Sequence, residues 1–283
     1  MIASSTRDSR RHLNGLPSIV LLAVIAIAWF LPVIWTVSLS FRPEEALVRS
    51  TAGLLPIPFT LANYQKVLIS SMVPRWFLNS VVVSVVHTVL VITVSALAAY
   101  AFARIPFKGK RIAFPFVLAG LMVPTQVTFI PLYLLFAQLG WHNSYQALIL
   151  PNTAAPFGVF LLTQFFKAIP KNIEEAARLD GASELGILFR IMMPLSLPAL
   201  AVLAITQFTG IWNDFTWPLL SATRPEWMTV TVGLSELVTT SGPVQFLGQT
   251  LAAAWAGAIP VILFFLFFQK RLIRGITLGV DSF

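Results

Sequence analysis

Five long stretches of this 283-residue chain contain no Lys, Arg, Asp or Glu, and they limit its possible folds more than any other feature. They cover residues 12–41, 76–103, 112–166, 191–213 and 237–269. A helix needs about 20 apolar residues to cross the hydrocarbon core of a bilayer. Four stretches therefore fit one span each, and the third fits two spans joined by a turn at 140–144.

The composition also indicates an integral membrane protein. Hydrophobic residues make up 57% of the chain and charged residues only 11%, whereas charged residues are roughly a quarter of an average soluble domain. A soluble core of this length could not bury so much apolar surface. Because the chain has no cysteine, disulfides, thiolate metal sites and a cysteine nucleophile are excluded.

We therefore predict an all-α, polytopic membrane protein with six transmembrane helices. The predicted spans are roughly 17–39, 77–101, 113–136, 146–166, 192–212 and 250–269. A cytoplasmic segment, 1–16, precedes a single transmembrane domain over 17–283. The first apolar run continues to Phe41, well past a small-x-small site at 26–28, so we expect an uncleaved first helix rather than a signal peptide.

The basic residues predict the orientation of these spans. Of the 19 Lys and Arg residues, 14 precede the first span or follow the second, fourth and sixth. The excess of positive charge on one side places both termini in the cytoplasm. The net charge of +8 therefore reflects membrane topology, and we do not expect a nucleic-acid partner.

Uncharged polar residues within the predicted spans have two interpretations. They could line a path for a hydroxyl-rich solute, or they could form hydrogen bonds between helices worth about 0.6 kcal/mol each. The candidates for the solute path are Asn79, Gln126, Asn152 and Gln207. His87 stands alone, so we expect no metal site around it.

The predicted loop 170–190, between the fourth and fifth spans, carries signals for a short cytoplasmic helix. Asn172 and Glu175 have the spacing of a capping box, and Glu174 and Arg178 form an i,i+4 pair. Gly181 can end the helix in the left-handed conformation. A helix of about eight residues, ~12 Å long, is marginal alone. It is therefore either docked in a partner's groove or an interfacial linker, and a second helix begins near Ser183.

This loop resembles that of a known family. The string Glu175-Ala176-Ala177-x-x-x-Gly181, followed by Ile191-x-x-Pro194-x-x-x-Pro198, is similar to the EAA loop of ABC-importer permeases. In that family the loop forms the coupling helix, which docks in a cleft of the ATP-binding subunit. The resemblance implies a set of ATPase-coupling residues: Glu174, Glu175, Ala176, Ala177, Arg178, Asp180 and Gly181.

Other strings resemble the carbohydrate branch of these permeases, in particular the second permease subunit of maltose-type importers. They are Asn63-Tyr64, Leu78-Asn79-Ser80, Ala98-Ala99-Tyr100-Ala101-Phe102-Ala103-Arg104, Trp212-Asn213-Asp214-Phe215 and Phe268-Gln269-Lys270-Arg271. The C-terminus departs from the family. Relatives often end in Gly-Ala-Val-Lys, whereas this chain ends in Gly279-Val280-Asp281-Ser282-Phe283, which puts a specific contact of the tail with the ATPase in doubt.

The resemblance implies a permease subunit of an ATP-driven, binding-protein-dependent importer of a sugar or oligosaccharide, in the bacterial inner membrane. The implied partners are a second homologous permease, two ATP-binding subunits and an external solute-binding protein. The chain lacks a GxxxxGK[ST] phosphate loop, so ATP and Mg are expected on the partner ATPases and no cofactor or metal on this chain.

The predicted outer loop, 213–249, is the implied contact with the solute-binding protein. The candidate contact residues are Trp212, Asn213, Asp214 and Trp217. Asp214 could instead be a plain anchor at the membrane interface, because tryptophans flank it.

Three alternatives remain from the sequence. The same importer type could carry glycerol phosphate or a polyamine, although no charged residue in the spans favours either. An ion-coupled secondary carrier usually needs an ionisable group near the middle of a span, and none is present. A membrane enzyme needs a catalytic constellation, and neither an HExxH motif nor paired carboxylates lie in the spans.

Overall fold

The computed structural model describes residues 16–69, 71–241 and 246–280, and every regular element among them is a helix. The all-α prediction is therefore confirmed. Apart from Leu16, the predicted N-terminal segment 1–16 lies outside the described residues, as do the last three residues of the divergent C-terminal tail.

The chain divides into two compact units. The first unit takes in the chain up to Ser71 together with Glu236–Ala256, and the second takes in Met72–Ser235 and Gly257 onward. The first unit begins with α1 (Leu16–Ser40), α2 (Glu44–Arg49) and α3 (Ala62–Ile69). Helices α14 (Val230–Ser241) and α15 (Leu247–Val280) contribute residues to both units. The single domain over 17–283 stays a prediction.

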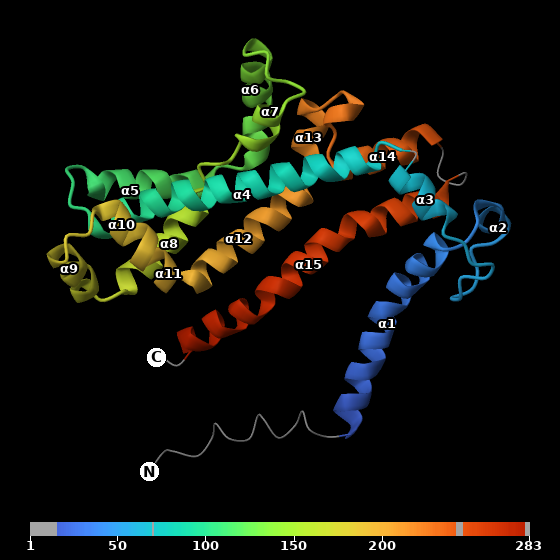
Figure 1. The fold of residues 1–283 in the computed structure, drawn as a ribbon, viewed down its shortest axis with the longest axis horizontal. Helices are drawn as coiled ribbons and strands as arrows, with labels where there is room; N and C mark the ends of the chain where they lie inside the picture. The colour runs from blue at the N-terminus through green and yellow to red at the C-terminus, as the bar shows by residue number, and fades with distance from the viewer. Residues whose placement is uncertain (1–15, 70, 242–245, 281–283) are drawn as a thin grey trace. The chain divides into compact units, whose positions relative to one another are not determined.

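The second unit is built around the longest of its own helices, α4 (Val73–Arg104) (Figure 1). The further elements of this unit, in chain order, are α5 (Lys110–Ala119), η1 (Gly120–Met122), α6 (Thr125–Gln138), α7 (Tyr145–Ile149), α8 (Pro156–Ala168), α9 (Lys171–Leu179), α10 (Glu184–Ile187), the π-helix η2 (Leu188–Met192), α11 (Met193–Leu195), α12 (Leu197–Trp212), α13 (Thr216–Ser221) and η3 (Pro225–Trp227).

Three of the expected spans are continuous helices. Helices α1, α4 and α15 are long and apolar enough to cross a membrane, and they cover the expected spans 17–39, 77–101 and 250–269. The charge-free stretches 12–41, 76–103 and 237–269 overlap these three helices, which explains why the sequence identified them.

The other three expected spans are not single helices. Residues 110–122 and 125–138 form two helices bent by 96°, and residues 184–195 and 197–212 form two helices bent by 84°. Pro124 lies at the first break, where it cannot continue the helix. The span expected at 146–166 is divided between α7 and α8, with Asn152 in a left-handed conformation at φ 60° between them. The described residues thus contain up to five spans if each bent pair is one.

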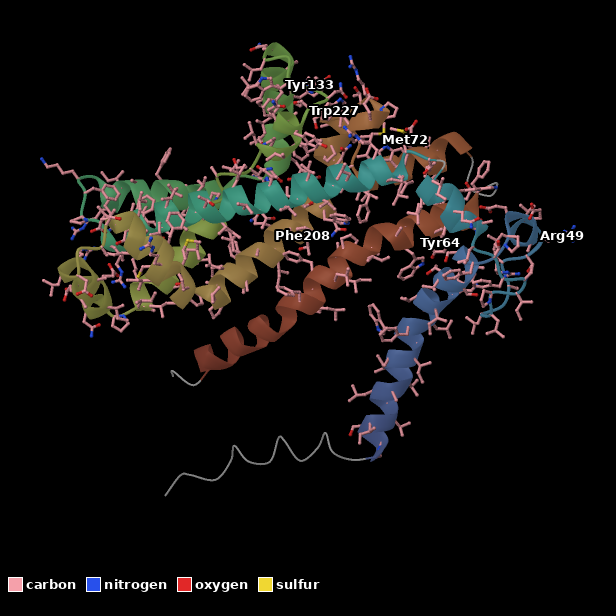
Figure 2. The ribbon with its side chains drawn as sticks, viewed as in Figure 1. Arg49, Tyr64, Met72, Tyr133, Phe208 and Trp227 are labelled. Atoms are coloured by element: carbon pink, nitrogen blue, oxygen red, sulfur yellow. The ribbon has the colours of Figure 1, made fainter. Side chains whose placement is uncertain are left out.

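Helix α4 packs against α8 and α12 to form the core of the second unit. Val91, Leu162 and Leu203, one from each of these helices, are fully buried. A Cβ atom on Gly158 of α8 would lie 2.4 Å from the Ser95 hydroxyl of α4, so glycine is what allows this close approach. On the opposite side of α12, Phe208, labelled in Figure 2, stacks on Phe264 of α15 with ring centroids 4.1 Å apart.

The first unit is held by polar side chains that bind backbone groups. The buried Asn63 amide donates to the Ser40 and Arg42 carbonyls at 2.9 and 2.8 Å. The Glu44 carboxylate of α2 accepts from the backbone N–H groups of Gly248 and Gln249 at 3.1 and 2.9 Å, and so caps the first turn of α15.

Candidate functional site

The short helix α9 lies at one end of the second unit, where α4 ends and α5 begins (Figure 1). It begins at Lys171, directly after Pro170. The prediction that Asn172 caps this helix is wrong, because Pro170 takes the capping position and Asn172 lies inside the first turn. The capping box with Glu175 therefore does not form.

The end of α9 matches the prediction. Gly181 has φ 81°, its N–H donates to the Arg178 carbonyl at 3.0 Å, and the Ala182 N–H donates to the Ala177 carbonyl at 3.0 Å. This is a Schellman motif, which needs a residue at positive φ. The next helix, α10, begins after Ser183, whose hydroxyl accepts from the Gly186 N–H at 3.2 Å. Both signals were readable in the sequence.

The two faces of α9 differ sharply in their surroundings. Glu174 and Ala177 are buried against the rest of the second unit, and Glu174 is only 2% exposed. Glu175, Ala176 and Leu179 are exposed, Leu179 to 89%. The adjacent glutamates of the EAA-like string therefore face different environments, one the protein and the other its surface.

Five side chains attach α9 to α4, and we call them the ring because helix α4 itself joins the first to the last. Arg104 Nε lies 2.5 Å from Glu174 Oε1, and Arg178 Nη2 lies 3.6 Å from Glu174 Oε2. Arg178 also donates to both carboxylate oxygens of Glu184, at 2.8 and 3.1 Å. The Tyr100 hydroxyl donates to Glu184 Oε2 at 2.5 Å. Because Tyr100 and Arg104 are four residues apart on α4, the ring closes on one face of that helix.

The charges in this ring balance. It holds two guanidinium groups and two carboxylates, joined by three ion pairs. The hydrogen bonds that Arg178 donates to Glu184 raise the pKa of the Arg178 guanidinium. The i,i+4 pair of Glu174 with Arg178 was predicted from the sequence and is confirmed.

Arg104 also binds the end of α8. Its guanidinium Nη2 donates to the Phe166 carbonyl at 2.6 Å and to the Ile169 carbonyl. A cation at this position satisfies carbonyls that lack helical partners and complements the helix dipole. Arg104 therefore connects three helices: α4, α8 and α9.

An open groove follows the α9–α10 turn, and both apolar and polar residues line it. The groove has a volume of ≈ 570 Å³ and runs from Gly181 to Ile191. Leu185 and Phe189 lie on it as large exposed apolar side chains. The exposed residues of α9 and this groove form one candidate docking surface.

The four candidates for the solute path differ in how exposed their side chains are. Asn79 is fully buried, donates to the Glu226 and Met228 carbonyls at 2.9 Å each, and accepts from the Tyr145 hydroxyl at 2.9 Å. Its amide is thus occupied by groups of the same chain. Gln126 and Asn152 are exposed and Gln207 is half-buried.

The expected outer loop 213–249 is largely helical, with α13, η3 and α14 in sequence. Trp212 and Trp217 are buried, and their indole N–H groups donate to the Gly257 and Ala147 carbonyls at 3.1 and 2.8 Å. Both tryptophans thus bond to backbone carbonyls of the second unit, and their contact with a binding protein stays a prediction. Residues 242–245 of this segment lie outside the described residues.

Asp214 has a local structural role. Its Oδ1 accepts from the Thr216 and Trp217 N–H groups at 3.1 and 3.4 Å, which caps α13. Burial raises the pKa of this carboxyl, and the two N–H groups oppose that shift. The neighbouring Asn213 is exposed.

The end of α4 opposite α9 binds η3 and the start of α14. Trp76 Nε1 donates to the Pro225 carbonyl at 2.8 Å, beside the two bonds from Asn79. A Cβ atom on Gly233 of α14 would lie 2.1 Å from the Trp76 ring, so this contact requires glycine. Trp227 of η3, labelled in Figure 2, meets Tyr145 edge-on with centroids 5.2 Å apart.

Sequence reasoning missed Tyr100, Arg104 and Glu184 as partners of α9. A signal was present, because Tyr100 and Arg104 have i,i+4 spacing and Arg104 is the first charge after a charge-free stretch.

Among the described residues, no group of three or more His, Asp or Glu side chains could hold a metal ion.

Residues 91–276 match the family model described as binding-protein-dependent transport system inner membrane component. The chain is 37% identical over 260 residues to the arabinooligosaccharides transport system permease protein AraQ of Halalkalibacterium halodurans, covering 91% of this chain and 92% of that protein. It is 34% identical to the trehalose/maltose transport system permease protein MalG of Thermococcus litoralis, covering 90% and 92%.

A solved structure is also similar. A chain of a bacterial ABC transporter involved in the import of the acidic polysaccharide alginate superposes with a TM-score of 0.77 at 25% identity. The match covers 95% of this chain and 99% of that chain. The bent and divided helices found here thus belong to a known permease fold.

Proposed function

The chain belongs to the family of binding-protein-dependent transport system inner membrane components, and from this premise we propose that it is the permease subunit of an ATP-driven importer for a sugar or oligosaccharide. The saccharides in the names of similar permeases support this solute class. ATP and Mg bind to two partner ATPase subunits, and a second permease completes the path through the bacterial inner membrane.

The observation that carries the proposal is the construction of α9. Its inner face is fixed by the ring of ion pairs, whereas Glu175, Ala176 and Leu179 are exposed. The Glu175 side chain is exposed and has neither a hydrogen bond nor an ion pair with the described part of the chain. A short helix so fixed on one side is suited to docking in the cleft of an ATPase, with Glu175 paired to a basic group there.

We further propose the finer topology: six membrane crossings, both termini and α9 in the cytoplasm, and α13–α14 outside. The three continuous helices and the two bent pairs support five crossings, and in this proposal the α7–α8 pair forms the sixth. The basic residues before the first span and after the second, fourth and sixth support the orientation. Since the chain has no native cysteine, single cysteines at Leu179 and Leu220 are a clean test by labelling from each side.

Alternating access would use the breaks in the bent pairs. Pro124 and Ser196 separate their two halves, so each half can tilt without breaking a continuous helix. Gln126, Asn152 and Gln207 are the polar residues left for the solute path, since the Asn79 amide is occupied. On the outer side, Asn213 is the exposed one among the four residues proposed to contact a binding protein.

The test is to isolate the chain from its native membrane and measure ATP hydrolysis in the eluate. We expect a second permease and an ATPase to co-elute, with hydrolysis stimulated by a sugar-loaded binding protein. Stimulation by glycerol phosphate or a polyamine, but by no saccharide, would contradict the solute class. Isolation as a homo-oligomer without an ATPase, with uptake driven by an ion gradient, would contradict the importer.

A further inference from the structure

We propose that the ring of Tyr100, Arg104, Glu174, Arg178 and Glu184 makes α9 and α4 one mechanical unit, so that a displacement of α9 by an ATPase moves α4. Arg104 and Glu174 are then positioning residues of coupling. The inference rests on the proposed function and goes beyond it, because it assigns the step inside this chain by which α9 transmits force.

The ion pair between Arg104 and Glu174 is buried. The side chains of Arg104 and Glu174 are 4% and 2% exposed. Two charges removed from water to this extent stay together, because separation would leave each one buried without a partner. The contact between α9 and α4 is therefore resistant to sliding, unlike an exposed ion pair.

Helix α9 is attached to α4 at two positions. Arg104 holds α9 through Glu174, and Tyr100 holds it through Glu184 and Arg178. The two attachments lie one turn apart on α4. The buried Arg104–Glu174 pair is the stronger, and the link through Arg178 and Glu184, which are 41% and 49% exposed, is the weaker. The hydrogen bonds from Arg104 to the end of α8 add a third helix to the same assembly.

Helix α4 also contacts a second segment at its other end. Its opposite end holds η3 and α14 through Trp76 and Asn79. Arg104 lies 25 residues after Asn79, which corresponds to about 38 Å of continuous helix. One straight element thus connects the ATPase-facing helix α9 with the segment proposed to face outward, and both ends are fastened by buried side chains.

The inward and outward glutamates of α9 then have different tasks. Glu175 is exposed on the docking surface, whereas Glu174 is buried and pairs with Arg104 and Arg178. Substitutions at Glu175 should change capture of the ATPase. Substitutions at Glu174 should leave capture intact and reduce the transport obtained from each ATP.

The experiment compares Glu174→Gln, Arg104→Gln and the double variant in the complete transporter, reconstituted in vesicles with its partners. The readouts are solute taken up per ATP hydrolysed and the amount of bound ATPase subunit. We expect each single variant to lower uptake per ATP roughly 2- to 30-fold, the range for residues along a coupling network. Bound ATPase should be unchanged, and the double variant should be no worse than the singles.

The matched control is Lys108→Gln, which removes an exposed positive charge four residues after Arg104. It should leave uptake per ATP unchanged. Normal uptake per ATP in Glu174→Gln, or additive losses in the double variant, would overturn the proposal. If the wild-type complex shows no ATP-dependent uptake, the proposed function fails instead, and the two failures are distinguished before any variant is compared.

A second measurement does not depend on transport. Spin labels on cysteines at Leu179 and Val89, both exposed, report the distance between α9 and α4. We expect a single narrow distance distribution that broadens in Tyr100→Phe, which removes one hydroxyl and no volume from the core. An equal width in the two proteins would overturn the rigid attachment even if the Glu174 variants fail to accumulate.

Discussion

The two ends of α4 are fastened by different chemistry. At the α9 end, the attachment consists of charged groups, with Arg104 and Glu174 at its centre. At the η3 end, neutral donors from Trp76 and Asn79 bind backbone carbonyls. The Arg104–Glu174 pair, Trp76 and Asn79 are buried, whereas the side chains of Arg178 and Glu184 are 41% and 49% exposed. The difference indicates that the α9 end depends on paired charges, whose separation is costly, whereas the η3 end depends on hydrogen bonds of moderate strength.

The largest effect on stability is expected at the charged end. Arg104→Ala would leave the Glu174 carboxylate buried without its closest partner, which costs about 3–5 kcal/mol in comparable pairs. We expect a large drop in the thermal unfolding temperature of the protein in detergent. Lys108→Ala is the control and should unfold as the wild type does. Equal unfolding temperatures for all three proteins would show that the ion pair does not fasten α9.

The neutral end should be less sensitive. Asn79→Ala removes the amide that binds the Glu226 and Met228 carbonyls, and each buried group left unpaired costs about 1–3 kcal/mol. The unfolding temperature should fall, and the proteolysis rate of the 222–230 segment should rise. Asn213→Ala, in an exposed position, is the matched control. A larger loss for Asn79→Ala than for Arg104→Ala would reverse the comparison between the two ends.

The turn after α9 should affect function more than folding. Gly181→Val places a β-branched residue at φ 81°, a conformation that costs roughly 1–2 kcal/mol for L-residues. We expect normal insertion, but ATP hydrolysis uncoupled from uptake because α9 no longer ends in the correct geometry. Gly210→Ala, which meets nothing within 4 Å, is the control. Full uptake in Gly181→Val would show that the turn is not needed for coupling.

The smallest effect on stability is expected on the outer face of α9. Glu175→Lys changes an exposed residue, and such substitutions are usually within about 0.5 kcal/mol. The unfolding temperature should stay the same, while less ATPase subunit is recovered with the purified chain. Recovery of the full amount would exclude Glu175 from the docking contact.

Much of this arrangement could be predicted from local sequence signals. The charge-free stretches identified α1, α4 and α15, because a helix without charges and of sufficient length has few alternatives to crossing a membrane. Gly181 and Ser183 predicted the end of α9 and the start of α10, since both act through neighbouring backbone groups.

The rest depends on contacts between distant residues. The bend at Pro124 was suggested by proline, but its size of 96° is set by packing. Glu174 and Glu175 are adjacent glutamates, so the local sequence does not show which of them is buried. Glu174 is the buried one, and it pairs with Arg104, which lies 70 residues earlier in the chain. Trp212 and Trp217 resembled interfacial residues, but carbonyls of α15 and α7 hold them inside the second unit.

The most direct test of the account is a photo-cross-linking residue introduced at Leu179, the most exposed of the large apolar residues of α9. The account predicts a cross-link to the ATP-binding subunit in intact membranes from position 179, and none from Leu220 in α13. A cross-link to the ATPase from position 220, or none from position 179 in an intact complex, would contradict the assignment of α9 as the helix that couples this permease to ATP hydrolysis.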